Sequence, residues 1–114
     1  MILTVGTLLR VRYPPTRAFI GFAVVRGESM TPALRPGDRL VVSYRRAPRV
    51  GDVVVARFAD GTLAVKRAVE RRTTGWWLLS DNPDHGVDSR HRGPVTEVTA
   101  VALARVWPRP RRRL

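Results

Sequence analysis

Turn-forming residues recur along this chain at short intervals, and their spacing is the feature that most restricts the fold. Gly37-Asp38, Gly51-Asp52 and Asp60-Gly61 each separate two runs rich in β-branched residues. Such pairs favour tight turns, because glycine adopts backbone angles that other residues avoid and aspartate accepts hydrogen bonds within its own turn. Between these turns no helical periodicity lasts longer than about two turns. The spacing therefore predicts short strands rather than helices.

The runs between turns define six expected strands, each rich in β-branched or aromatic residues. Their expected ranges are 18–26, 39–44, 53–58, 63–70, 76–79 and 95–107. This pattern predicts an all-β domain, a small and partly open barrel of antiparallel strands. We place the domain at residues 17–107. An N-terminal arm (1–16) ending in two prolines precedes it, and a basic tail (108–114), expected to be mobile, follows it.

Composition excludes several kinds of site and location. The chain has no cysteine, and its two histidines, His85 and His91, lack a third ligand at metal spacing, so we expect neither a metal nor another cofactor. Arginines interrupt the N-terminal third, so no run approaches the roughly 18 apolar residues of a membrane span. The first residues also lack the features of an export signal, which predicts a cytoplasmic protein without a transmembrane anchor.

Lys66 is the only lysine, beside twenty arginines. Arginine stays protonated at any accessible pH, whereas a lysine amine can lose its proton, so this position either needs a titratable amine or holds a lysine by chance. On the expected strand 63–70, Lys66 shares one face with Ala64 and Ala68, and neither of these flanking residues is acidic. An amine there is expected to be desolvated rather than paired with a carboxylate.

Four groups of residues follow one another along the chain in a distinctive order. They are Ser29-Met30-Thr31-Pro32-Ala33-Leu34, the two Gly-Asp turns, Lys66-Arg67 well beyond the serine, and Ser80-Asp81-Asn82 with Asp88-Ser89-Arg90. Together they resemble the signal peptidase I family. The resemblance runs from about Val24 to Gly93, and order and spacing carry it more than any single motif. Taken alone, Ser29 before Met-Thr-Pro would more simply cap a turn or a helix.

The resemblance implies a serine peptidase in which Ser29 attacks the peptide bond and Lys66 takes its proton. It also implies that Asp88 and Arg90 form a charge pair that braces the site. The family's serine two positions before the nucleophile is replaced by Gly27, so the oxyanion would depend on backbone N–H groups at Ser29 and Gly27. The family's lysine-orienting serine corresponds to Gly86, so the sequence does not identify what orients Lys66.

A narrower resemblance concerns the maturation proteases of nickel-type superoxide dismutase. It depends on Gly75-Trp76-Trp77 before the Ser-Asp-Asn motif, on the ending Trp107-Pro108-Arg109, and on the absence of an anchor and of a second β-domain. It implies a precursor protein as substrate, whose N-terminal leader is removed to expose a nickel-binding histidine. We assign the two tryptophans themselves to the core and to surface cover.

Two other functions remain open. A self-cleaving repressor shares the Ser/Lys pair but needs an N-terminal DNA-binding domain, for which we expect no room in the segment before Ser29. A basic β-barrel that binds nucleic acid fits the net charge of +12, but it needs exposed stacking aromatics, which this sequence places mainly in strands expected to be buried. We therefore expect no specific nucleic-acid partner. Weak contact with an anionic surface is expected through Arg109, Arg111, Arg112 and Arg113.

Overall fold

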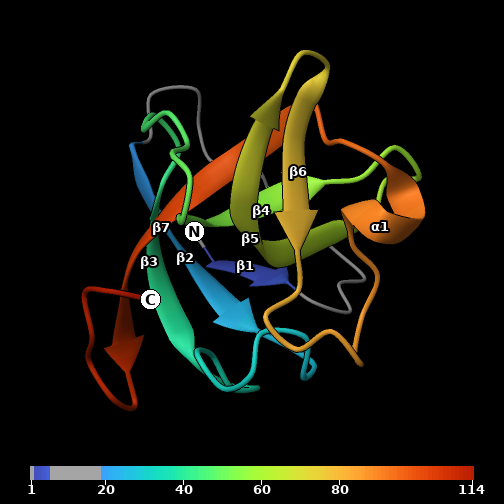
Figure 1. Cartoon of the computed structure of the whole chain (residues 1–114). Coiled ribbons are helices and arrows are strands. Elements are labelled where there is room, and N and C mark those ends of the chain that lie inside the picture. Colours follow the sequence, from blue (N-terminus) through green and yellow to red (C-terminus); the bar gives the residue numbers. More distant parts are fainter. Residues whose placement is uncertain (1, 6–18) are drawn as a thin grey trace.

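Seven strands form one curved sheet in the computed structural model, which describes residues 2–5 and 19–114 (Figure 1). A single helical turn lies between the last two strands. The elements are β1 (Ile2–Val5), β2 (Ile20–Val25), β3 (Arg39–Ser43), β4 (Val53–Arg57), β5 (Leu63–Arg72), β6 (Gly75–Leu79), α1 (Ser89–Arg92) and β7 (Glu97–Trp107). Their order across the sheet is β1-β2-β3-β7-β4-β5-β6.

The six expected strands correspond to β2 through β7, and the all-β class is confirmed. Every neighbouring pair is antiparallel except β1 with β2, which is parallel. The last strand, β7, lies between β3 and β4, so it joins the two halves of the sheet. Strand composition does not predict this position, because it depends on which edges remain unpaired after the local hairpins form.

Strand β4 and the first half of β5 are buried on both faces, and their residues there are largely apolar. Alternate residues enter two different apolar clusters. One cluster contains Val53, Val55, Leu63 and Val65 with side chains from β2, β3 and the loop after β2, including Met30 and Leu34. The other contains Val54, Ala56, Ala64 and Ala68 with Phe58, Trp76, Leu78, Val95 and Val101. Lys66 projects on the second side, between its two alanines.

The C-terminal segment packs against the sheet, contrary to the mobile tail expected from its composition. Arg105 and Arg111 form an isolated antiparallel bridge, with N–O distances of 2.8 Å in both directions. The buried Arg105 guanidinium also donates to the carbonyls of Arg109 and Ala33. Leu114 contacts the first apolar cluster. Backbone pairing and one buried guanidinium therefore order a segment that its charge and prolines alone would leave free.

The expected N-terminal arm contains β1, while residues 6–16 and the proposed domain boundary at residue 17 lie outside the described part of the chain. In the parts of the chain described here, no helix combines the length and the apolar character that crossing a bilayer requires.

Candidate active site

Ser29 lies in the loop that follows β2. Two side chains of this loop, Met30 and Leu34, are buried in the first apolar cluster and hold the loop in place. Met30 and Leu34 are 1% and 0% exposed, and the N–H of Leu34 donates to the Met30 carbonyl at 2.8 Å. Gly27, just before, has a φ of 75°, which a residue with a side chain rarely adopts. The turn at Gly27 and the two apolar anchors leave Ser29 9% exposed, at the floor of a cavity.

Lys66 lies in the middle of β5 and is 3% exposed. Its cross-strand neighbour is Val54, and the amine donates a hydrogen bond of 3.0 Å to Ser80 Oγ. Burial lowers the pKa of Lys66; the charge of Asp88 opposes this shift, and the charge of Arg90 adds to it. No carboxylate forms an ion pair with this amine within the described residues. The side chain is therefore placed where losing its proton costs less than it would in water.

Gly86 brings Ser29 and Lys66 to the same point. A Cβ atom on Gly86 would lie 2.7 Å from Ser29 Cβ, 3.5 Å from Ser29 Oγ and 3.0 Å from Lys66 Nζ. Both side chains also line one cavity of about 350 Å³, together with Gly86 itself. No hydrogen bond joins the hydroxyl directly to the amine in the described part of the chain. Such catalytic contacts are often long without substrate and shorten once it is bound.

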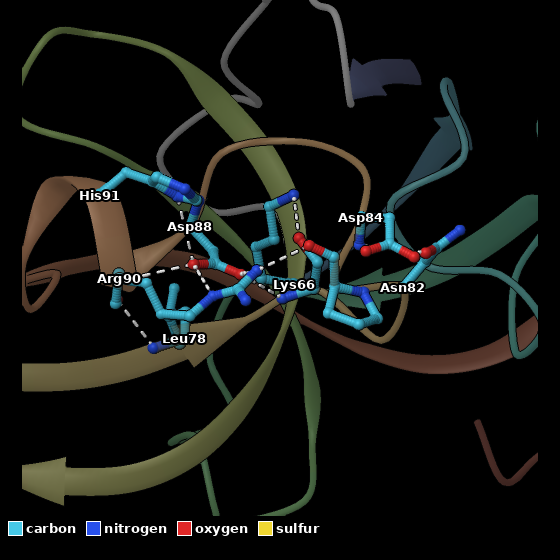
Figure 2. Close-up of polar contacts among 10 residues, drawn as sticks. Lys66, Leu78, Asn82, Asp84, Asp88, Arg90 and His91 are labelled. Carbon is cyan, nitrogen blue, oxygen red and sulfur yellow. Dashed lines mark hydrogen bonds and ion pairs between the residues drawn. The ribbon is translucent and has the colours of Figure 1, made fainter.

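The loop after β6 carries a buried carboxylate, Asp88, that holds several residues around Lys66 in place (Figure 2). It accepts from the N–H of Ser80 at 2.9 Å and from two nitrogens of the Arg90 guanidinium at 3.0 Å each. Burial alone would raise the pKa of Asp88, but the Arg90 side chain and the N–H groups of Ser80 and Arg90 outweigh it and bring the pKa to about 2. The charge pair expected between Asp88 and Arg90 is thus present, and it contacts the residue that holds Lys66.

Asn82 connects the two loops that carry the site. Its N–H donates to the Ser29 carbonyl at 2.9 Å, and its side-chain amide donates to Thr31 Oγ1 at 3.0 Å. The distance between the serine loop and the lysine-holding loop is therefore set by direct hydrogen bonds.

The sequence does not reveal two roles in this site. Ser80 enters the sequence argument only as part of a motif, although a serine directly after a strand that neighbours the lysine strand is a usable signal. The clamp made by Asn82 has no such signal, because it joins two loops that lie far apart in the chain. The predicted oxyanion positions, Gly27 and Ser29, both line the cavity, and their N–H groups donate to no acceptor among the described residues.

The two histidines lie in different parts of the loop region after β6. His91 closes the helical turn α1, where its Nδ1 accepts from the Asp88 N–H at 3.3 Å. His85 is exposed and lines the cavity near Ser29. Across the described ranges, no three histidine, aspartate or glutamate side chains gather as a metal site would require.

A buried serine and a buried lysine without a carboxylate partner, facing one cavity of an all-β domain, are the features of serine peptidases that use a lysine as base. Comparison with known proteins agrees with this class. Over residues 10–100 the chain matches the Peptidase S24-like family, and it belongs to that family.

Curated relatives include both peptidases and repressors. Mitochondrial inner membrane protease subunit 1 of Schizosaccharomyces pombe is 32% identical over 115 residues, which cover 74% of this chain and 71% of that protein. The LexA repressor of Paracidovorax citrulli is 40% identical over 81 residues, covering 69% of this chain but 35% of the repressor. LexA repressor 1 of Pseudomonas syringae pv. tomato is 38% identical over 85 residues, covering 71% and 41%. The chain is thus a serine peptidase domain of the signal-peptidase and LexA type, and it spans well under half of these repressors.

Proposed function

We propose that this protein is an endopeptidase in which Ser29 is the nucleophile and Lys66 is the general base. The observation that carries the proposal is the Lys66 amine, which is 3% exposed, has no carboxylate partner in the described residues and shares a cavity with Ser29. A serine hydroxyl is a weak nucleophile until a neighbouring base removes its proton, and a neutral amine can serve as that base.

In the proposed reaction Lys66 takes up a proton and gives it back once in each of the two steps, acylation and deacylation of Ser29. Ser29 Oγ attacks the carbonyl carbon of the substrate while its proton passes to Lys66 Nζ, and the backbone N–H groups of Gly27 and Ser29 stabilise the oxyanion. The C–N bond then breaks as Lys66 returns the proton to the leaving amine. A water molecule next gives a proton to Lys66 and attacks the acyl ester, after which Ser29 leaves and recovers its proton.

For the substrate, we propose a precursor protein from which an N-terminal leader is removed, with the precursor of nickel-type superoxide dismutase as the specific candidate. Support for this candidate comes from the sequence resemblance around Trp76-Trp77 and Trp107-Pro108-Arg109. Family membership implies that the substrate is a protein but does not identify which protein it is. Cytoplasmic residence and weak contact with anionic surfaces through the C-terminal arginines stay predictions.

The test incubates the purified protein with a nickel-type superoxide dismutase precursor and measures the mass of any released N-terminal fragment. We expect Ser29→Ala and Lys66→Arg each to lower the cleavage rate at least 1,000-fold. Ser43→Ala is the matched control for the serine, because Ser43 is similarly buried and, within the described part of the chain, its hydroxyl accepts only from the backbone of Arg45 and Arg46.

The outcomes separate the two parts of the proposal. An active protein that ignores this precursor but cleaves a mixed peptide library, in a manner dependent on Ser29, would retain the peptidase and refute the dismutase substrate. Full activity in Lys66→Arg would refute the Ser/Lys mechanism, since arginine keeps the charge and cannot lose its proton.

A further inference from the structure

One hydroxyl contacts the Lys66 amine directly, and it belongs to Ser80. The Nζ–Oγ distance is 3.0 Å, and Ser80 is 7% exposed, so water has little access to this contact. Among the described residues this is the one hydrogen bond that the amine makes. Ser80 is therefore the described residue best placed to orient the amine.

Ser80 is itself held by the strand before it and by a hydrogen bond of its backbone N–H. It directly follows β6, whose Leu78 is fully buried, and its N–H donates to Asp88 Oδ2 at 2.9 Å. Asp88 is in turn held by the Arg90 guanidinium. A side chain with so constrained a backbone presents its oxygen in one place, as a positioning group must.

The other loop position that faces both reacting groups has no side chain to offer. Gly86 has a φ of 79°, and a Cβ there would approach Ser29 Cβ to 2.7 Å, closer than two such carbon atoms can pack. A serine at 86 would be strained and would push the nucleophile aside. The lysine-holding hydroxyl therefore has to come from the end of β6 and not from the glycine.

We propose that Ser80 is the positioning residue of Lys66. A neutral amine has two N–H bonds and one lone pair, so donating one N–H to Ser80 restricts the directions in which the lone pair can point. This restriction favours the rotamer whose lone pair faces the cavity that contains Ser29 Oγ. The inference depends on the proposed peptidase function for its catalytic meaning, but the contact itself does not.

Several charged groups act on the same amine and must be kept constant in the test. Asp88 and Arg90 act from the loop behind it. The remaining charged or titratable side chains around its cavity are Arg26, Glu28, His85 and Arg92. None of these is altered in the variants below.

Because Lys66 is the only lysine, protein labelled with ¹³C-lysine gives one Cε resonance, and its pH titration reports this amine alone. We expect Ser80→Ala to lower the Lys66 pKa further, because the ammonium loses its hydrogen-bond acceptor. We also expect kcat to fall about 10- to 100-fold with KM changed less than twofold, using a fluorogenic peptide built on the site cleaved in the precursor assay. Ser80→Thr, which keeps the hydroxyl, should restore both quantities to near the wild-type values.

Ser43→Ala is the control, and neither its titration nor its kcat should change. A folded Ser80→Ala with an unchanged titration, or with an unchanged kcat, overturns the proposal. So does a Ser80→Thr variant that is folded but as slow as Ser80→Ala. If the titration shifts as expected while the wild-type protein cleaves no peptide, the proposed function fails and the contact between Ser80 and Lys66 stands.

Discussion

Lys66 and Arg67 are consecutive residues of β5, and the structure treats their positive charges in opposite ways. Lys66 is 3% exposed and donates one hydrogen bond, to a neutral hydroxyl. Arg67, on the other face, donates two hydrogen bonds to the Asp81 carboxylate, at 2.7 and 3.2 Å. It also donates to the carbonyls of Gly51 and Leu114. One charge is compensated in full, and its neighbour is left without a counter-ion among the described residues.

The hydrogen-bond acceptors of Lys66 and Arg67 are consecutive residues as well. The Ser80 hydroxyl accepts from Lys66, and the Asp81 carboxylate accepts from Arg67. The alternation of side chains along a strand places each pair on its own side of the sheet. The ion pair between Arg67 and Asp81 stabilises the junction of β4, β5 and β6. The neutral hydroxyl of Ser80 does less than a carboxylate would to stabilise the protonated form of Lys66, so this amine loses its proton more easily. Burial alone therefore does not create a base; it has to be combined with a neutral partner in place of a carboxylate.

Exchanging the partner is the most disruptive test of this contrast. In Ser80→Asp the amine gains a carboxylate, so the Lys66 pKa should rise and the neutral fraction near pH 7 should collapse. We expect cleavage to fall more than 100-fold in the peptide assay, with the Cε titration moving to higher pH. A variant that remains active, or whose Lys66 titrates lower than in the wild type, would contradict the account.

Removing the charge of Asp88, the carboxylate that holds the Ser80 N–H, should have the second-largest effect, in this case on stability. The pKa of Asp88 is about 2, below its ordinary value of 3.8. Its contribution to stability is therefore complete above about pH 4 and is lost as the pH falls towards 2, an effect on the order of 2 kcal/mol. In Asp88→Asn, thermal unfolding should start from a lower Tm at pH 7 and should depend less on pH between 4 and 2. Parallel Tm profiles for variant and wild type across that window would rule this out.

Arg67, whose charge is paired with Asp81, should matter for stability more than for the reaction. Arg67→Ala removes the pair with Asp81 and two backbone contacts, so we expect a loss of about 1 to 2 kcal/mol in denaturant unfolding and less than a tenfold change in kcat. Arg49→Ala is the control, because the Arg49 side chain is exposed and makes no such contact with the described residues; it should change stability by less than about 0.5 kcal/mol. Equal losses of stability in Arg67→Ala and Arg49→Ala would show that the contacts of Arg67 do not stabilise the fold.

The smallest effect on stability should come from removing the uncompensated amine. Lys66→Met keeps the length and the apolar stem but removes a buried polar group, so the free energy of unfolding should stay constant or rise by up to about 1 kcal/mol. Cleavage should be abolished in the same variant. A loss of stability as large as that of a typical destabilising core substitution would instead show that the amine holds the fold rather than serving the reaction.

Much of this arrangement could be predicted from the sequence. Turn spacing and β-branched runs located all six expected strands, and alternation on 63–70 placed Lys66 between Ala64 and Ala68. The small neighbours Ala64 and Ala68 also predict a desolvated amine without an adjacent carboxylate. These features are local, so a short window of sequence contains the information.

What the sequence could not predict depends on contacts between distant segments. The insertion of β7 between β3 and β4, the clamp from Asn82 to the Ser29 loop and the packing of the C-terminal segment each join positions that lie far apart in the chain. The helical turn α1 is too short for any periodicity to show. The role of Ser80 escapes prediction for a related reason, because its contact with Lys66 depends on the register of β5 against β6, with Arg67 opposite Leu79.

The mechanism with Lys66 as base requires that this amine lose its proton more easily than an ordinary lysine does, and the wild-type ¹³C-lysine titration measures this directly. We expect a single resonance whose midpoint lies below 10.5, the ordinary pKa of a lysine. A midpoint at or above 10.5 would show a lysine that is charged throughout the working range of a peptidase, and the proposed mechanism would then be wrong.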